Sequence, residues 1–314
     1  MSVLVVGGAN YDLIAHGTRL PLEGETLVAT GFHEAPGGKA ANQAAAAARW
    51  GARTRFVGCI GDDGFGRSIV LDLEAAGVVV EHVRRLSDGT GLGMVFMDTH
   101  GRYATMVAPR ANARLDAHVI AELPLEVWND ATVLCIALEA PHDALLAAAR
   151  HAARQGLQIV INAAPADRLS SELDDVATVL VCNEHEAAEL ADATVTDRAS
   201  ALHLARHLSR EQRSVVVTLG ADGAVAWSPH EGASDAAGHA VPAVDTLGAG
   251  DVFTGVLAAE LSSGSTLGDA VNAATDASAA SVTVHGARFV EGTPDFVTET
   301  LAATRTRHLE EEPS

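Results

Sequence analysis

Short runs of β-branched and other apolar residues alternate with longer alanine- and leucine-rich segments along most of the chain. The runs predict strands at residues 3–6, 54–57, 78–83, 133–136, 159–161, 179–181, 215–218 and 224–227. The segments predict helices at residues 40–50, 66–76, 142–155, 184–190, 197–209, 249–261 and 266–284. Almost continuously apolar strands between helices are typical of a mostly parallel sheet covered on both faces. We therefore expect an α/β fold.

Two stretches, residues 12–35 and 92–108, depart from this alternation, because they show partial period-two patterning without helical periodicity. Within the second stretch, residues 93–98 and 102–107 flank a Thr-His-Gly turn and predict a β-hairpin. Such strands can form a small separate sheet that acts as a lid over a site. Residues 229–239 are expected to form a loop, and residues 305–314 a charged, frayed tail.

The charge of the chain limits the class of partner. Its 314 residues include 21 Lys plus Arg and 41 Asp plus Glu, which gives a formal net charge of −20. This balance excludes a basic nucleic-acid-binding surface and a polybasic membrane-binding segment. No apolar stretch reaches the roughly 18 residues that a membrane span needs. The overall field would repel an anionic substrate, so the site for such a substrate needs a local device.

Three cysteines, Cys59, Cys135 and Cys182, each lie in or beside an apolar run and share no CxxC spacing. This pattern favours buried free thiols in a reducing compartment. The N-terminal residues enter a strand-like run directly, without the basic segment of a signal peptide. We therefore expect a soluble cytoplasmic protein.

A Gly248-Ala249-Gly250 turn stands between a strand-like run and an apolar helix. The N–H groups at the start of such a helix have no partner within it, and together with the helix dipole they favour an anion. Asp251 follows this turn, and two interpretations are open. It is either a first-turn carboxylate that complements the dipole or a general base beside a transferred phosphate.

Two further clusters place polar residues next to predicted element boundaries. In residues 37–43, Gly-Gly-Lys-Ala-Ala-Asn-Gln, a glycine turn opens an alanine-rich helix. A lysine at a helix N-terminus opposes the dipole, and its placement is explained if a polar or anionic ligand binds there. In residues 10–12, Asn-Tyr-Asp, a carboxylate follows the first strand, at the edge where α/β sheets bind ligands. This carboxylate can accept two hydrogen bonds from a sugar diol, or it can form an Asx turn.

Four segments of the chain together resemble motifs of the ribokinase (PfkB-type) family of carbohydrate kinases. Residues 37–43 resemble its N-terminal signature, and residues 245–251, Asp-Thr-Leu-Gly-Ala-Gly-Asp, resemble its C-terminal signature. Residues 183–186, Asn-Glu-His-Glu, match its Asn-x-x-Glu element, and residues 218–223, Thr-Leu-Gly-Ala-Asp-Gly, its nucleotide-side loop. The order and spacing agree over about residues 3–292, which favours the general-base interpretation of Asp251.

The resemblance implies a ribokinase-like three-layer α/β/α fold with a central mostly parallel sheet and a small β-sheet lid. One kinase domain would span residues 1–304, with lid strands from about 12–35 and 92–108, followed by the tail at 305–314. The implied reaction is ATP-dependent transfer of the γ-phosphate to the 5-hydroxyl of a pentose. D-ribose is the expected substrate and ribose 5-phosphate the expected product.

The resemblance also implies a role for each matching residue. Asp251 would be the catalytic base, after Gly248, and the backbone N–H groups of Ala249, Gly250 and Asp251 would form an anion hole. The sugar would be held by Asn10, Asp12, Gly38, Lys39, Asn42 and Glu139. The nucleotide would lie against Asn183, Glu186, Thr218, Gly220 and Gly223.

Two ions and a second subunit are implied as well. Glu186, with Asn183, would place Mg²⁺ through water beside the phosphates. K⁺ would bind the side chain of Asp245 and the carbonyl groups of Leu247, Ser281, Val284 and Gly286. The lid strands of similar kinases often form a dimer clasp, so we expect a homodimer through the lid.

Five positions depart from the pattern of the family: Ala40, Arg110, Ala164, Thr275 and Val290. Arg110 stands where glycine is usual, and a cation near the sugar could narrow the pocket or favour an acidic sugar. Two alternatives therefore stay open. One is a kinase of a nucleoside, 2-deoxyribose, fructose or a keto-deoxy sugar acid, and the other is a sugar-binding regulatory protein without catalysis. The presence of Asp251 and the Gly-Ala-Gly turn argues against the second alternative.

Overall fold

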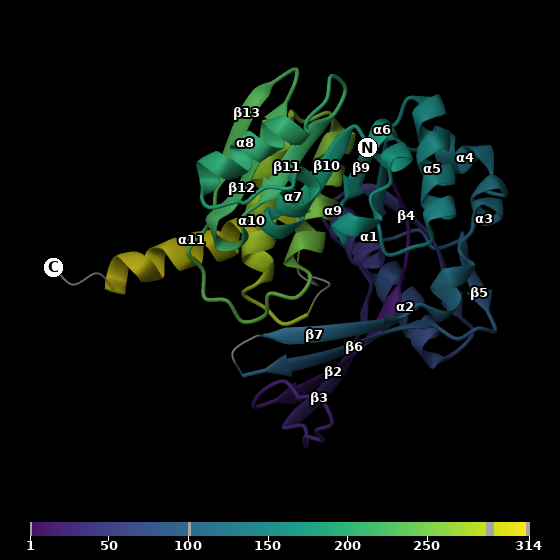
Figure 1. Ribbon diagram of the computed structural model, residues 1–314, viewed down its shortest axis with the longest axis horizontal. Helices are drawn as coiled ribbons and strands as arrows, with labels where there is room; N and C mark the ends of the chain where they lie inside the picture. Colours follow the sequence, from purple (N-terminus) through teal and green to yellow (C-terminus); the bar gives the residue numbers. More distant parts are fainter. Residues whose placement is uncertain (1, 100–101, 287–291, 312–314) are drawn as a thin grey trace.

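The computed structural model describes residues 2–99, 102–286 and 292–311. In these residues a nine-stranded sheet crosses the molecule and has helices on both faces (Figure 1). Its strands lie in the order β13 (Gly232–Ala237), β12 (Gly223–Ser228), β11 (Ser214–Thr218), β10 (Val179–Asn183), β9 (Gln158–Asn162), β8 (Val133–Ala137), β1 (Ser2–Val6), β4 (Arg53–Gly61) and β5 (Val83–Leu86).

The strands from β11 to β5 are parallel to one another, whereas β12 and β13 add an antiparallel edge. Parallel strands place all their carboxyl ends along one side of the sheet. Ligands of open α/β sheets bind in the crevice outside these ends. The predicted site residues that follow β1, β8, β10 and β11 therefore share one edge.

The helices cover the two faces because successive strand residues point to opposite sides. Val3 and Val5 of β1 enter one buried core, and Leu4 and Val6 enter the other. The first core is closed by α1 (Lys39–Arg49), α2 (Gly64–Ala75), α9 (Ala249–Ser263), α10 (Leu267–Ser281) and α11 (Pro294–Glu311). The second is closed by α3 (Ala117–Ala121), α4 (Leu125–Asn129), α5 (His142–Gln155), α6 (Ser171–Val176), α7 (Glu184–Ala191) and α8 (Arg198–Leu208). This three-layer α/β/α arrangement confirms the expected fold.

A second sheet of four strands, counted over the described residues, lies to one side of the large sheet (Figure 1). Its order is β3 (Gly31–Gly37), β2 (Asn10–Gly17), β6 (Gly91–Asp98) and β7 (Tyr103–Ala108). The two segments that lacked helical periodicity therefore form the expected small sheet, including the antiparallel β6–β7 hairpin. We call this four-stranded sheet the lid.

Three local predictions were wrong. The predicted loop at residues 229–239 contains β13, whose sequence lacks β-branched residues but which pairs along its length with β12. The predicted strand at residues 78–83 begins only at Val83, the first residue of β5, and before it Val79 makes one isolated bridge, because the Val78 N–H closes the end of α2 by bonding the Leu73 carbonyl. The predicted frayed tail from residue 305 instead continues α11 to Glu311, since Val297 and Leu301 anchor that helix in the core. Residues 312–314 lie outside the described residues.

Short 3₁₀ turns complete the connections at η1 (Arg110–Arg114), η2 (Ala166–Arg168) and η3 (Gly220–Asp222). Within the described part of the chain, none of the helices has both the length and the apolar content needed to cross a bilayer. Cys59, Cys135 and Cys182 are free and buried, as the sequence predicts.

Candidate active site

The Gly-Ala-Gly turn is the first turn of α9. Gly248 caps this helix in the left-handed conformation, with φ of 77°, which glycine adopts without a steric penalty. The N–H of Ala249 donates to the Thr246 carbonyl at 3.4 Å, and the N–H of Asp251 to the Gly248 carbonyl at 2.9 Å. Gly250 between them is exposed, and a Cβ added there would meet nothing within 4 Å. The turn is therefore open to a ligand, although two of its three predicted anion-hole N–H groups make bonds within the turn.

Asp251 is a buried carboxylate with a donor on each oxygen. Only 7% of the residue is exposed, and its Oδ2 and Oδ1 accept hydrogen bonds from Asn42 Nδ2 at 2.9 Å and Gln43 Nε2 at 3.2 Å. Burial raises the pKa of Asp251, and the Lys39 charge and the two amide donors oppose this rise. The Lys39 charge and the two donors favour the ionised form, and in that form the carboxylate can accept a proton from a hydroxyl group.

Close contact between α1 and α9 brings these donors to Asp251. Residues 40–47 of α1 are all buried, and most of them are alanine. Their small side chains allow a neighbouring helix to pack close to the backbone of α1. On α9, Gly255 lies one turn after Asp251, and a Cβ there would come within 2.4 Å of the Gln43 carbonyl oxygen. The absence of that Cβ lets the two helices approach closely enough for both amides to reach the carboxylate.

Lys39 and Glu139 form a second pair beside Asp251. The Lys39 N–H donates to Glu139 Oε2 at 3.2 Å, and its Nζ lies 3.7 Å from Glu139 Oε1. Burial alone would lower the pKa of Lys39, but the charges of Asp251, Glu139 and Glu186 outweigh it and raise that pKa. The lysine therefore stays protonated among three carboxylates, as a cation placed where the overall charge of the chain is negative.

Asn10 and Asp12 lie where the chain passes from β1 into the lid. The Asp12 carboxylate occupies the space that a Cβ would take at Gly37, 2.0 Å from Oδ2, or at Gly93, 2.1 Å from Oδ1. Gly38, with φ of 91°, packs so tightly on this passage that a Cβ would approach the Asn10 N–H nitrogen to 2.6 Å. The glycines therefore bring the predicted sugar-binding residues of the lid next to the start of α1.

Asn112 is a polar residue of this region that the sequence did not single out. Its side-chain amide bonds both the N–H and the carbonyl of Ala9 at 3.0 Å, and its Nδ2 donates to Asn10 Oδ1 at 2.8 Å. Gln43 was also missed as a separate site residue, although it belongs to the 37–43 motif. Its place directly after Asn42 was the signal that could have identified it.

Asn183 and Glu186 form a reciprocal capping box at the start of α7. Asn183 Oδ1 accepts the Glu186 N–H at 2.9 Å, and Glu186 Oε2 accepts the Asn183 N–H at 2.8 Å. Burial raises the pKa of Glu186, whereas its bond to the Asn183 N–H and the charge of Lys39 lower it. The Asn-x-x-Glu element is thus a helix cap that also faces the charged cluster.

A cavity of about 300 Å³ opens beside the first turn of α9. Its lining includes three of the five residues predicted for the nucleotide side, Thr218, Gly220 and Gly223, together with Ala249 and Gly250. Asn183 and Glu186, the other two, do not line it. The remaining walls are largely small or apolar and come from the loop before α9 and from α10. This shape suits an aromatic base and a sugar whose phosphates would reach the start of α9.

Asp245 joins the two segments that contain the predicted K⁺ ligands. Its Oδ1 accepts the Leu247 N–H and its Oδ2 the Gly286 N–H, both at 3.0 Å. The Ser281 carbonyl accepts the Val284 N–H at 3.4 Å in the same turn. Oxygen ligands of this kind suit a hard cation. Among the described residues no group of three or more His, Cys, Asp or Glu side chains is arranged to hold a metal ion.

The departures from the family pattern are accommodated locally. Arg110 has a φ of 44°, and its Nη1 donates to the Thr90 carbonyl at 3.0 Å, over Gly89. Ala40 is buried where Gly7 leaves room for its methyl group. Thr275 lines the 300 Å³ cavity, but its hydroxyl donates to the Val271 carbonyl at 2.9 Å. Val290 lies outside the described residues.

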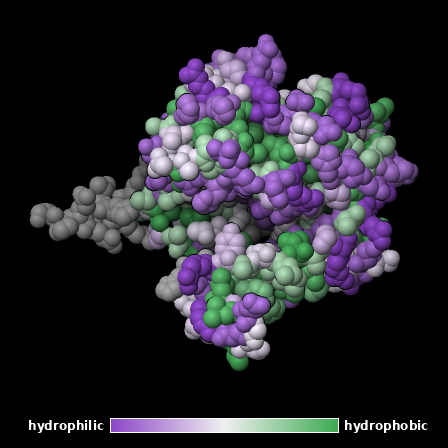
Figure 2. Space-filling view, viewed as in Figure 1, coloured by the Kyte–Doolittle hydropathy of each residue, from purple (hydrophilic) through white to green (hydrophobic). Residues whose placement is uncertain are grey.

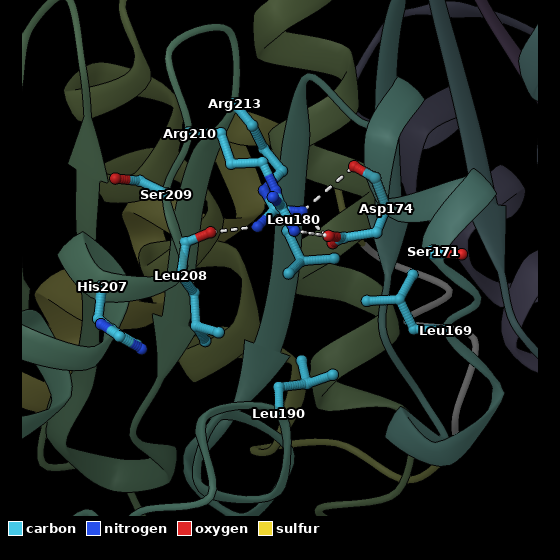
Figure 3. A pocket seen from close by; sticks show the side chains of 10 residues that line it. All are labelled: Leu169, Ser171, Asp174, Leu180, Leu190, His207, Leu208, Ser209, Arg210 and Arg213. Carbon is cyan, nitrogen blue, oxygen red and sulfur yellow. Dashed lines mark hydrogen bonds and ion pairs between the residues drawn. The ribbon is translucent and has the colours of Figure 1, made fainter.

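A second cavity, of about 320 Å³, lies away from the predicted site residues, among α6, β10 and the end of α8 (Figure 3). Arg210 and Arg213 both bond the carboxylate of Asp174, and Arg213 also donates to the Leu208 carbonyl. These contacts tie α6 to the segment between α8 and β11. We therefore assign the charged group at this cavity a structural role.

Comparison with known proteins agrees with this geometry over most of the chain. Residues 1–294 match the family described as "pfkB family carbohydrate kinase". A ribokinase of Schizosaccharomyces pombe is 32% identical over 91% of this chain and 93% of its own length. A ribokinase of Bacillus subtilis is 31% identical over 96% of this chain and 99% of its own.

A solved ribokinase structure also resembles the chain. The structure of Arabidopsis thaliana ribokinase complexed with ribose and ATP superposes with a TM-score of 0.84 at 29% identity, over 95% of this chain and 98% of that one. The family match and these curated relatives each extend over at least nine tenths of the chain. The chain belongs to the pfkB family of carbohydrate kinases.

Proposed function

We propose that the protein transfers the γ-phosphate of ATP to the 5-hydroxyl of a pentose, with D-ribose as the substrate and ribose 5-phosphate as the product. The observation that carries this proposal is the position of Asp251. Its buried carboxylate directly follows Gly250, which lines the nucleotide-sized cavity, and interacts electrostatically with Lys39 and Glu139. The relatives named above are ribokinases, and one of them was solved with ribose and ATP.

The side chains present can perform this reaction in one displacement. Asp251 accepts the proton of the sugar hydroxyl, whose oxygen forms a bond to the γ-phosphorus as the bond to the β–γ bridging oxygen breaks and ADP leaves. The start of α9 would present the Gly250 N–H and the positive end of the helix dipole to the transferred group, since the Ala249 and Asp251 N–H groups bond within the turn. Asn10, Asp12, Gly38, Lys39, Asn42 and Glu139 would hold the sugar against the base.

Two cations suit the residues present. Glu186, with Asn183, offers a carboxylate near Lys39 that could hold Mg²⁺ through water, and the ion would neutralise charge on the phosphates. Asp245 with the carbonyl groups of Leu247, Ser281, Val284 and Gly286 would supply oxygen ligands to K⁺, and the bonds from the Leu247 and Gly286 N–H groups to Asp245 bring the two segments together. Because the chain has a net charge of −20, nucleotide affinity should depend strongly on these cations.

The test combines a substrate panel with one variant. A coupled assay with ATP and Mg²⁺, with and without K⁺, should give the fastest turnover on ribose among ribose, deoxyribose, fructose, sugar acids and nucleosides. Asp251→Asn keeps the shape of the side chain but removes the base, so kcat should fall by about 10²–10⁴ while calorimetric ribose binding persists. A variant that kept most of its activity would refute the base assignment, and no turnover on any substrate would favour a regulatory protein.

We also propose that the protein forms a homodimer through the lid. Phe32, Phe96 and Met106 lie on the lid face opposite to Asp12, by the alternation and register of the strands, and are 62%, 45% and 68% exposed. Figure 2 shows hydrophobic residues on the lid surface. An exposed apolar sheet face of this kind is typical of an interface. Phe96→Glu should halve the mass measured by light scattering, whereas Leu125→Glu, on α4, should leave it unchanged.

The three free thiols are consistent with a reducing compartment, and we propose the cytoplasm as the location of the protein.

A further inference from the structure

Gln43 lies between two other buried side chains and connects the core of the molecule to Asp251. Its Nε2 donates to Asp251 Oδ1 at 3.2 Å, and its Oε1 accepts a hydrogen bond from Cys135 Sγ at 3.3 Å. Gln43 and Cys135 are both 0% exposed. The three residues come from α1, α9 and β8, so the contact joins two helices and the central sheet.

The chemistry of the two neighbours determines how the Gln43 amide is oriented. The Asp251 carboxylate can only accept, so it requires the NH₂ group of the amide. Burial, reinforced by the charge of Asp251, raises the pKa of the Cys135 thiol to about 12, so the S–H group remains a donor at physiological pH. A donor there requires the amide oxygen. The reversed amide would place oxygen against a carboxylate and NH₂ against S–H, which makes it unfavourable at both ends.

We propose that Gln43 and Cys135 are positioning residues for the phosphoryl transfer: the thiol holds the amide, and the amide holds the catalytic carboxylate. This inference rests on the proposed function. Asn42 already binds Oδ2, so the bond from Gln43 to Oδ1 fixes the plane of the carboxylate as well as its position. A donor on the carboxylate also opposes the effect of burial and favours the ionised form, which is the form that accepts a proton.

The two residues also differ in how replaceable they are. The amide must supply a donor to Asp251, which an apolar side chain of the same size cannot do. The thiol has only to supply one donor to the amide, which a serine hydroxyl also does. Gln43→Leu should therefore disturb the orientation and ionisation of the Asp251 carboxylate. Cys135→Ala should disturb them less, and Cys135→Ser should behave like the wild type.

The experiment measures kcat/KM for the sugar against pH, because its acidic limb reports the ionisation of the base in the free enzyme. In Gln43→Leu this limb should move to higher pH by about one unit, because the donor that stabilises the ionised form is lost. Cys135→Ala should move it in the same direction by a smaller amount, and Cys135→Ser should return it to the wild-type position. Cys59→Ala is the matched control, since this buried cysteine lies in β4 and should leave the limb in place.

Three results would overturn the inference: a Gln43→Leu limb that superposes on the wild type, indistinguishable Cys135→Ala and Cys135→Ser profiles, or lower thermal stability with an unmoved limb. If Gln43→Leu does not fold, the Cys135 pair decides alone, because Cys135→Ala removes a single sulfur atom. Wild-type turnover is measured first. Its absence would count against the proposed function, whereas an active wild type with unmoved limbs would count against this inference alone.

Discussion

Gly255 offers a direct test of how the approach of two helices creates the site. In Gly255→Ala the added Cβ would lie 2.4 Å from the Gln43 carbonyl oxygen, 2.8 Å from the Ala46 Cβ and 3.1 Å from the Ala47 nitrogen. Ordinary contacts begin near 3.4 Å, so α1 and α9 have to separate by about 1 Å. Two of the three contacts are backbone atoms, which cannot rotate away. The perturbation therefore acts on the spacing of the helices and adds no charge or polar group.

The size of the effect follows from that displacement. Overpacking of a buried site costs about 1–3 kcal/mol, and the higher helix propensity of alanine returns at most about 1 kcal/mol. A net loss of about 1–2 kcal/mol corresponds to a decrease in Tm of about 2–3 °C, because the unfolding entropy of about 2.1 cal/mol/K per residue is summed over 314 residues. The same separation lengthens the bonds from Asn42 and Gln43 to Asp251, now 2.9 and 3.2 Å. Misplacement of a reacting group by about 1 Å can reduce kcat by about 100-fold.

Calorimetric unfolding and steady-state kinetics measure the two effects separately. Gly64→Ala is the control, because Gly64 begins α2 and a Cβ there meets nothing within 4 Å. That variant should keep its kcat and gain up to about 1 kcal/mol. If Gly255→Ala were as stable and as active as Gly64→Ala, the idea that this glycine sets the approach of α1 to α9 would be wrong.

Three further predictions concern charges around the site. Lys39→Met removes the cation that lowers the pKa of Asp251, so the acidic limb of the kcat/KM profile should move to higher pH. An unchanged profile would contradict the charge interaction between Lys39 and Asp251. Arg110→Gly should leave the ratio of ribose to sugar-acid turnover unchanged, because the guanidinium binds the Thr90 carbonyl; a changed ratio in the substrate panel would show that Arg110 reaches the sugar. Asp245→Ala loses bonds to two backbone N–H groups, so calorimetry should show a loss of about 1–3 kcal/mol, and a K⁺ titration should show no stimulation; retained stimulation would reject the proposed K⁺ site.

The sequence predicted the large elements well, because their signals are local. His142 to Gln155 form α5 with the predicted boundaries, and the strands from β8 to β11 appear within a residue or two of their expected ends. The edge strand β13 could not be predicted, since its six residues contain no β-branched side chain and depend on pairing with β12. Residues 78–83 have the composition of a strand, but the N–H of Val78 bonds the Leu73 carbonyl at the end of α2 and is therefore not available to pair with a neighbouring strand.

The site divides in the same way. Lys39, Asn42 and Asp251 stand in motifs, and family resemblance could place them together although Asn42 and Asp251 are 209 residues apart in the chain. Cys135 could not be identified, because a cysteine in an apolar strand has the same sequence signal whether it fills the core or contacts a polar side chain. Asn112 was missed for a related reason: its partner is the backbone of Ala9, and no sequence pattern records such a contact.

At the start of α7, the Glu186 side chain has two roles, one in the capping box and one in the proposed ion site. The Glu186 carboxylate completes the helix start through a single oxygen, a task that the amide of glutamine performs equally well. The capping bond itself does not require a negative charge, whereas the proposed Mg²⁺ site would use it. The helix cap therefore requires a side chain of this length with one acceptor atom. The proposed catalytic role requires in addition that the side chain be negatively charged. Glu186→Ala would remove the capping bond and the negative charge together. Glu186→Gln would keep the capping bond and remove only the charge.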